Sequence, residues 1–347
     1  MKAIIIFYTE ERLKNTMRKL RRMVCAWSMM LVSVAPALAQ ENQKLALTNT
    51  PGMFNHLDLS VDLGTTGIGF DLAMPVGDYV QLRTGFDFMP KFHHNMSFKV
   101  QVGDPNEQDE SQSSAKFERL ANMLEGFTGY RVDDHIDMVG EPTFNNFKFL
   151  VDVFPFKNNK HWHFTAGFYL GSSKVAKACN TMEDMPSLMA VAIYNNMYDK
   201  ISSGEGIIFN VGDYSLPIFN DPELEDRILS YGRMGIHVGD MRADKTPYMM
   251  VPDENNMVRT TIKVNPFRPY IGFGYGGKLL KGDDRYHVSF DCGMMMWGGT
   301  PKILTHDGTD LANEVENIRG KVGDYVDLIK VFKVYPVLQL RLTRRLF

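Results

Sequence analysis

The sequence predicts an all-β protein, an antiparallel, up-and-down transmembrane β-barrel of eight strands with helical insertions in its loops. Three observations lead to this prediction. Apolar and polar residues alternate with a period of two in eight segments, and the connections between these segments are alternately short and long. No stretch after residue 40 has the continuous apolar length of a membrane-spanning helix. If the chain enters a membrane, it must therefore do so as a closed sheet.

Residues 17–39 have the layout of a secretory signal peptide. A basic start is followed by an apolar run and by Ala37-Leu38-Ala39, the small-residue pattern that signal peptidase requires. The alternative is a transmembrane helix, but the apolar part is short and is not followed by positive charges. We therefore expect residues 1–39 to be removed, with Met17 as an alternative start.

The charge balance and the cysteine content exclude two classes of protein. The chain has 38 Lys and Arg against 41 Asp and Glu, and cleavage after Ala39 would remove 7 of the basic and 2 of the acidic side chains. An acidic mature chain is not suited to nucleic acid. The mature chain would keep Cys179 and Cys292, which are too few for a disulfide scaffold, and whether they pair is left open.

Each expected strand has one apolar and one polar face, as Leu82 and Phe86 alternate with Arg83 and Asp87. The polar faces are rich in glycine with single charges, which suits the cramped interior of a narrow barrel better than the solvated face of a sandwich. The eight segments are 57–63, 68–72, 80–88, 147–153, 162–170, 269–276, 285–294 and 338–343. Residues 204–216 and 257–264 also have strand character, so the sheet extends beyond the membrane or the barrel has ten strands.

The loop lengths divide the chain. We expect residues 40–55 to be a periplasmic segment and residues 56–347 to be the barrel. Long insertions at about 91–143, 174–256 and 298–333 would be extracellular, because outer-membrane barrels have short periplasmic turns and long outer loops.

Charged residues at the polar positions of the strands are the first candidate site. These lumen charges are Asp58, Asp62, Arg83, Asp87, Lys148, Asp152, Asp291 and Arg341. They could line a selective pore, but an eight-stranded barrel leaves almost no aqueous path, so we expect them to pair with one another and fill the interior. In particular, we expect Arg341 to pair with Asp58 or Asp62.

Other clusters give no chemistry. His93-His94 and the group Asp133, Asp134, His135 and Asp137 lack the tight spacing of metal ligands, so we interpret them as solvated loop residues. No catalytic signature is present, and we predict no catalytic residue, metal or cofactor.

Helical spacing of apolar residues occurs within the long insertions. Three helices are expected, over 117–127, 189–197 and 311–329, with Pro186 at the start of the second and Asp310 as the cap of the third. They would form a cap or ligand-binding face above the barrel, or their apolar stripes would pack on one another and on the barrel rim, and both can hold together.

Five segments together resemble outer-membrane β-barrel proteins of the Bacteroidetes type, OmpA-like in the transmembrane part and of the porin-like superfamily. They are GTTGIGFDLAMPVGDYVQLRTGF (64–86), DVFPFKNNKHWHFTAGFYLG (152–171), NPFRPYIGFGYG (265–276), HVSFDCGMMMWGGTPKI (287–303) and YPVLQLRLTRRLF (335–347).

The resemblance implies location in the cell outer membrane among outer-membrane lipids, passage with periplasmic chaperones, and insertion by the barrel assembly machinery. That machinery would read the last strand, with Leu338, Leu340, Leu342 and Phe347 as the assembly signal. Phe347 is out of phase with the three leucines, and a bulge at Arg344-Arg345 would restore the phase.

The function expected from these features is that of a non-enzymatic integral outer-membrane protein with a structural, adhesive or surface ligand-binding role. A porin for small solutes and an outer-membrane lipid-modifying enzyme are the alternatives. A soluble secreted β-protein is a further alternative, in which the apolar faces of the strands would form a dry interior.

Overall fold

The structure is a computed structural model, and it describes residues 54–103, 110–129, 131–156, 159–204, 207–211, 214–219, 222–280, 282–318 and 320–346. The expected signal peptide and Phe347 lie outside these described residues.

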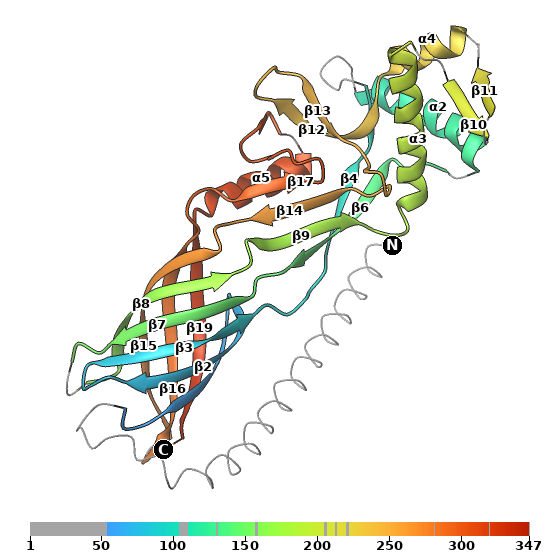
Figure 1. Ribbon diagram of the computed structural model, residues 1–347. Helices are drawn as coiled ribbons and strands as arrows, with labels where there is room; N and C mark the ends of the chain where they lie inside the picture. The colour runs from blue at the N-terminus through green and yellow to red at the C-terminus, as the bar shows by residue number, and fades with distance from the viewer. Residues whose placement is uncertain are drawn as a thin grey trace.

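Eight strands form a closed antiparallel barrel, seen at the lower left of Figure 1. They are β1 (Asp58–Gly64), β2 (Gly67–Pro75), β3 (Val80–Phe88), β7 (Asn146–Val153), β8 (Trp162–Gly171), β15 (Phe267–Leu280), β16 (Asp283–Met296) and β19 (Val334–Arg345). The order is β1-β19-β16-β15-β8-β7-β3-β2, and β1 pairs with both β2 and β19, so the barrel has no free edge. The prediction of eight strands is confirmed, and the alternative of ten is wrong.

Short turns join the strands at one end of the barrel. They link β2 to β3, β7 to β8 and β15 to β16, and the described chain also starts and ends at this end. Gly77 and Gly282 have φ angles of 136° and 93° in two of these turns, which glycine adopts without the strain that a side chain would add. We call this end the turn end and the opposite end, where the long insertions leave, the loop end.

Five barrel strands continue beyond the loop end as a second sheet. It is built from β4 (His94–Lys99), β6 (His135–Pro142), β9 (Lys174–Asn180), β14 (Arg259–Lys263) and β17 (Lys302–Thr305). Its order, β17-β14-β9-β6-β4, repeats the order β16-β15-β8-β7-β3 of the barrel strands next to them in the chain. The strand expected at 257–264 is thus part of an extension of the sheet.

The remaining elements lie beside this extension and beyond its far end (Figure 1). One sheet contains β13 (Pro247–Met250), β12 (Met234–Met241) and β18 (Val315–Glu316), and β5 (Gln101–Val102) also pairs with β12. A separate hairpin is formed by β10 (Ile207–Val211) and β11 (Tyr214–Phe219). The helices are α2 (Glu110–Thr128), α3 (Met185–Ser202), α4 (Pro222–Tyr231) and α5 (Gly320–Val331). No helix among the described residues is long and apolar enough to cross a membrane.

We call the five-stranded extension and these remaining elements the outer module. Its core is separate from the barrel interior and includes Leu124 of α2, Ile136 of β6, Val191 of α3 and Val315 of β18, none more than 1% exposed. The outer module therefore has the apolar core of an ordinary folded unit.

Two of the expected helices differ from the prediction. In α3, Pro186 lies in the first turn as expected, but Ile193 is 40% exposed, and the buried face contains Val191 and Tyr194 instead. The helix is apolar on more than one side, so spacing alone could not select the buried face.

The third helix starts at Gly320 and not after Asp310. Asn317 and Gly320 have φ angles of 52° and 64°, which a right-handed helix does not allow. The Asp310 carboxylate instead accepts hydrogen bonds from the backbone N–H groups of Ile303 and Ala312, which fixes a turn.

Candidate functional site

The polarity of the strands inverts where the barrel passes into the outer module. In β7, the inward side chains of Lys148 and Asp152 are buried and the outward side chains of Phe149 and Val153 are exposed. In β6, the preceding strand, Ile136 is buried inside and its neighbours are polar and exposed. The barrel is thus polar inside and apolar outside, and the module is the reverse.

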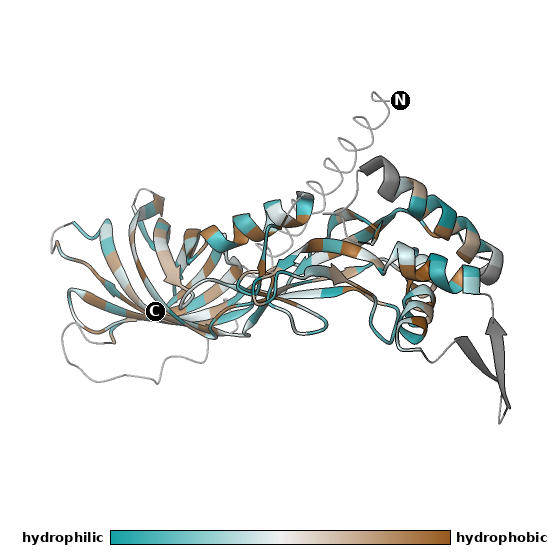
Figure 2. Ribbon diagram, turned by 90° about the horizontal axis from the view of Figure 1, so that it is seen from above, coloured by the Kyte–Doolittle hydropathy of each residue, from teal (hydrophilic) through white to brown (hydrophobic). Residues whose placement is uncertain are grey.

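The same inversion occurs in other continued strands, and Figure 2 shows the alternation of apolar and polar residues along them. In β8, Phe164 is 60% exposed, whereas in β9 the exposed residues are Lys174 and Lys177. In β16, Phe290 is 52% exposed, whereas in β17 Ile303 is buried and Lys302 is exposed.

Apolar side chains cover the outside of the barrel. Phe86, Phe149 and Leu340 are 63%, 37% and 53% exposed, and Leu59 and Phe168 are partly exposed. A soluble β-protein would bury these side chains in a dry interior, so that expectation is wrong. An exposed apolar surface of this extent marks an interface with another apolar phase.

Inside the loop-end half of the barrel lies a lysine cluster formed by Lys148, Asp62, Asp71 and Asp87. Lys148 Nζ lies 2.5 Å from Asp62 Oδ2, 2.7 Å from Asp71 Oδ1 and 2.6 Å from Asp87 Oδ1. The three carboxylates are close enough to one another to resemble a metal site, but the lysine ammonium lies among them. Lys148 thus supplies a positive charge at the centre of this carboxylate group.

Inside the turn-end half lies an arginine cluster formed by Arg83, Arg341, Asp152, Asp291 and His163. Arg83 lies 3.0 Å from Asp152 and 3.5 Å from Asp291, and Arg341 lies 3.5 Å from Asp152 and 3.3 Å from Asp291. His163 Nε2 lies 2.7 Å from Asp291 Oδ1. Each aspartate therefore bridges both arginines.

The two clusters are joined and buried. Arg83 Nη1 lies 3.6 Å from Asp71 of the lysine cluster. Arg83, Lys148 and Asp152 are 1%, 0% and 0% exposed. Buried charges of this kind are tolerated only when they are paired, and removing one partner of a buried pair costs about 3–5 kcal/mol.

A cavity of about 380 Å³ opens at the turn end and is lined in part by the arginine cluster. His163 and Arg341 line it, and Arg83 and Asp291 are not among its lining residues. Near its mouth, Asp58 accepts a hydrogen bond of 3.1 Å from Gln81 and lies 3.7 Å from Arg345.

The expected pairing of Arg341 with Asp58 or Asp62 is wrong. Asp62 and Arg341 are register partners across β1 and β19, but Asp62 binds Lys148 and Arg341 binds Asp152 and Asp291. The strand register brings Asp62 and Arg341 next to each other in the sheet, but it does not determine which cation pairs with which carboxylate.

Apolar and aromatic side chains fill the barrel near the loop end. Leu150, Tyr169 and Met295 are 0% exposed and belong to one packed cluster with Tyr270 and Val337. The rings of Trp297 and Tyr335 stack at 5.1 Å beside them. The interior therefore contains two charged clusters and an apolar cluster, the apolar plug, whose Leu150 lies between Lys148 and Asp152 along β7.

Three interior residues were absent from the lumen charges chosen from the sequence: Asp71, His163 and Arg268. The alternation pattern could have found them, because each is flanked by apolar outward residues of its strand. Arg268 is 0% exposed, binds the Asn146 side chain and the Ser172 carbonyl, and lies 5.1 Å from the centre of the Phe144 ring.

The histidine and aspartate groups of the first insertion do not come together. His93 lies 2.8 Å from Glu141, His94 Nε2 lies 3.1 Å from the Tyr325 hydroxyl, and His135 lies 2.8 Å from Asp134. These contacts are exposed, each histidine has a different partner, and only His135 and Asp134 are adjacent in the sequence. Cys179 and Cys292 are both free thiols.

A small polar group ties β13 to β17 in the outer module. The Tyr248 hydroxyl donates to Asp307 Oδ2 at 2.8 Å, and Thr305 Oγ1 and the Thr309 N–H donate to Asp307 Oδ1. Burial raises the pKa of Tyr248 to about 12. Burial alone would raise the pKa of Asp307, but these hydrogen bonds outweigh it and hold that pKa below its ordinary value of 3.8.

The last described strand has a continuous register. Leu338, Leu340 and Leu342 of β19 are 41%, 53% and 44% exposed on the outside of the barrel. The pairing with β1 continues without a shift from Gln339 to Arg345, so the bulge expected at Arg344-Arg345 is absent. The expected role of Phe347 as an assembly signal concerns a residue outside the described chain.

Together these features define a class: closed β-barrels with an apolar outer surface and an interior filled by paired charges. Two solved structures are similar over much of the chain. CarO2 of Acinetobacter baumannii has 13% sequence identity and a TM-score of 0.34, with 84% of this chain and 98% of that chain covered. CarO of the same organism has 13% identity and a TM-score of 0.35, with 83% and 97% covered.

No protein-family model and no curated protein matches the chain. At the identity and TM-score of the two CarO structures, the similarity gives no information about function. The functional argument therefore depends on the geometry of the chain itself.

Proposed function

We propose that the protein is an integral outer-membrane β-barrel that acts as a non-conducting anchor and presents the outer module at the cell surface. The observation that carries this proposal is the inversion of polarity along strands that run from the barrel into the module. A strand in water on both sides would keep one apolar face toward one core. An inversion places lipid around Phe149 and Phe164, and water around Lys174 and Lys177.

The orientation follows from the loops. In outer-membrane barrels, short turns lie in the periplasm and long loops lie outside. The turn end with β2–β3, β7–β8 and β15–β16 would then be periplasmic, and the outer module would be extracellular. Access of a protease to the module on intact cells tests this orientation.

The filled interior favours an anchor over a pore. Arg341 and His163 line the cavity at the turn end. The lysine cluster and most of the apolar plug lie further toward the loop end. Moving Arg83 or Lys148 would break ion pairs that have almost no exposure to water. A small solute therefore has no polar path through the barrel.

The ion pairs inside the barrel support a non-enzymatic role. His163 and Asp291 resemble a catalytic pair, but Asp291 also lies 3.3 Å from Arg341 and 3.5 Å from Arg83, which makes it part of the charge balance of the barrel. We infer a structural, adhesive or ligand-binding role for the outer module, which has its own core of sheets and helices.

Recordings of the purified full-length protein in planar lipid bilayers test the anchor. The proposal predicts no stepwise current, whereas a porin for small solutes would give regular single-channel steps. Mass spectrometry of lipid A from a deletion strain tests the lipid-modifying alternative. An unchanged lipid A supports the anchor, and the loss of one modification that returns on complementation would contradict it.

A further inference from the structure

Helix α5 has a second apolar face that no part of the described chain covers. One face packs on the core of the outer module through Val326, which is 2% exposed, with Val322 and Ile329 beside it. On the opposite face, Leu328 and Val331 are 57% and 77% exposed. Both faces are apolar in the last two turns of the helix.

The second face continues around the end of the helix. At 100° per residue, Leu328 and Val331 lie about 140–200° from Val326, with Asp327 at the edge of this side, and Phe332 is the first residue after the helix. Phe332 is 36% exposed. We define Leu328, Val331 and Phe332 as the outward face of α5.

The first half of the same side of the helix is charged. Lys321 and Asp324 lie in line with Leu328 and are both exposed. The helix therefore changes along its length from a charged outward side to an apolar one. The apolar end is the end from which the chain enters the barrel, because β19 begins at Val334.

The outward face is continuous with the apolar surface of the barrel. Only Phe332 and Lys333 separate α5 from β19, whose first residue, Val334, is 41% exposed. The next outward leucines of that strand, Leu338 and Leu340, are 41% and 53% exposed. Figure 1 draws α5, in red, beside the end of the barrel at which β19 starts.

We infer that the C-terminal half of α5 lies in the outer leaflet of the surrounding membrane, with Leu328, Val331 and Phe332 among acyl chains. This inference depends on the proposed membrane barrel, because that barrel supplies the lipid next to Val334. Lys330 and Lys333 flank the outward face, and lysines at such a boundary extend their ammonium groups to the level of lipid phosphates.

The inference assigns α5 a role in placing the outer module. Its inner face contacts the core of the module, and the Tyr325 hydroxyl lies 3.1 Å from His94 Nε2 of β4, the edge strand of the extension. A helix fixed to lipid on one side and to the module on the other would hold the module at a set height above the bilayer.

Quenching of a fluorescent label by brominated lipids tests the inference. Single cysteines are placed at Val331, Leu340 and Lys321 in full-length protein in which Cys25, Cys179 and Cys292 are replaced by alanine, and each is labelled with bimane in nanodiscs of phosphatidylcholine. Lys321 is the matched control, because it is exposed on the same side of the helix at its charged end, about 15 Å along the axis from Val331. Labels in the hydrocarbon layer of roughly 30 Å should lose more than half of their fluorescence.

The expected result is strong quenching at Val331 and Leu340 and little at Lys321. Quenching at Leu340 without quenching at Val331 would overturn the inference about α5 and leave the membrane barrel intact. Absence of quenching at both positions would overturn the membrane barrel as well. Equal quenching at Val331 and Lys321 would contradict a lipid contact limited to the C-terminal half of α5, and a label at Phe332 repeats the test independently.

Discussion

Lys148 Nζ lies 2.6 Å from Asp87 Oδ1 across the β3–β7 pair, with neither side chain exposed to water by more than 1%. Asp62 and Asp71 complete the cluster. One cation thus contacts carboxylates from three strands of the barrel wall. The lysine ties these strands together from the inside, which makes it the residue whose loss should affect the barrel most.

Replacing Lys148 by methionine should therefore destabilise the barrel. Three buried carboxylates would lose their cation, and we expect the free energy of unfolding to fall by about 3–5 kcal/mol. Urea unfolding in lipid vesicles, followed by the shift of the folded barrel band in electrophoresis, measures this change.

The matched control is Lys278→Met. Lys278 pairs with Asp284 near the turn end, and both side chains are more than half exposed, at 53% and 62%. An exposed pair contributes about 0–1 kcal/mol, so this variant should behave almost like the native protein. Equal losses in the two variants would argue against a special role for the lysine cluster.

A charge introduced on the lipid-facing side of the barrel should lower the folding free energy more than a charge introduced on the outer module. Phe149→Arg places a cation in the middle of β7, and we expect a loss of about 2–4 kcal/mol of folding free energy at that depth. His135→Arg on β6, the strand before it, should change the stability by less than about 0.5 kcal/mol, because His135 is exposed to water.

Both variants are measured by urea titration in vesicles, and the difference between them is the result that matters. If Phe149→Arg is tolerated as well as His135→Arg, the outside of β7 is not in lipid.

Gly69 should not accept a side chain. A Cβ atom added there would overlap the Asp87 carboxylate and lie 3.1 Å from Lys148 Nζ. We expect Gly69→Ala to cost about 1–3 kcal/mol, as overpacking of a filled interior does. The urea midpoint of the barrel measures the effect.

The control is Gly126→Ala in α2, where nothing lies within 4 Å of an added Cβ atom. Removing a glycine from a helix should stabilise the outer module by about 0.4–1 kcal/mol. Opposite signs for the two substitutions are the expected outcome, and a neutral Gly69→Ala would mean that the lysine cluster has free space.

The outer module should lose stability in acid through Asp307. The pKa of Asp307 is lower in the folded protein than its ordinary value of 3.8, so the folded state favours the charged form. This contribution is fully present above the ordinary pKa, and it is lost as the pH falls through the lower pKa of the folded state.

Asp307→Asn should thus be less stable than the native protein at about pH 6, and the gap should close as the pH falls to about 2. Urea unfolding followed by near-ultraviolet circular dichroism at several pH values measures the gap. A gap that stays constant with pH would show that the ionisation of Asp307 makes no contribution.

Much of the barrel could be predicted from the sequence because its strands have a strict period. Each strand meets two different environments, so outward residues such as Phe86 and inward residues such as Arg83 alternate without exception along β3 from Arg83 to Asp87. Short turns with glycine at positive φ, such as Gly282, mark where strands reverse.

The pairing inside the barrel could not be predicted in the same way. Asp62 and Arg341 are register partners, but long side chains reach strands that are not neighbours. Lys148 of β7 reaches Asp62 of β1 although β2 and β3 lie between these strands. Which cation meets which acid depends on side-chain length and on glycines such as Gly69 that leave space.

The outer module was the least predictable part. The strands β6, β9 and β17 invert the polarity of the barrel strands that they continue. Alternation with a period of two does not show whether the apolar residues face the interior or the outside of the sheet. The third helix was predicted too long because its helical spacing of apolar residues includes Val315. In the structure, Val315 belongs to β18 and pairs with Met241 of β12.

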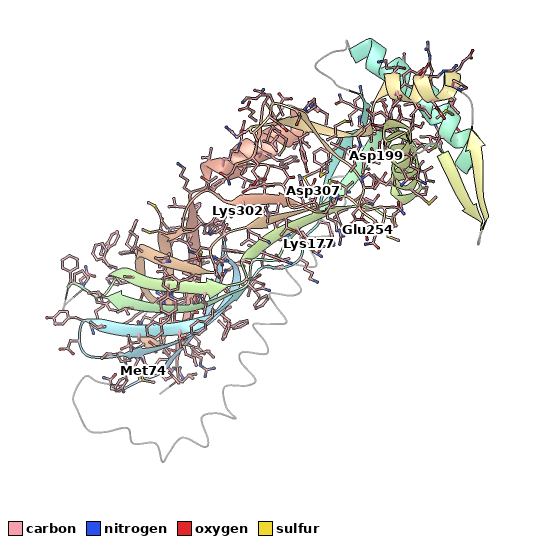
Figure 3. All side chains as sticks on the ribbon, turned by 45° about the horizontal axis from the view of Figure 1, so that its top comes forward. Met74, Lys177, Asp199, Glu254, Lys302 and Asp307 are labelled. Atoms are coloured by element: carbon pink, nitrogen blue, oxygen red, sulfur yellow. The ribbon has the colours of Figure 1, made fainter. Side chains whose placement is uncertain are left out.

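Cysteine labelling along β8 and β9 tests the central claim, that the polarity inversion marks the boundary between lipid and water. Single cysteines replace Phe164, Phe168, Lys174 and Lys177 in protein that lacks Cys179 and Cys292. A water-soluble maleimide is then applied to intact outer membranes. Figure 3 labels Lys177 on the outside of the module. The account predicts protection at Phe164 and Phe168 and rapid labelling at Lys174 and Lys177, with all four labelled after denaturation. Labelling of folded protein at Phe164 as fast as at Lys177 would contradict it, because lipid around the barrel should shield Phe164, which the chain itself leaves 60% exposed.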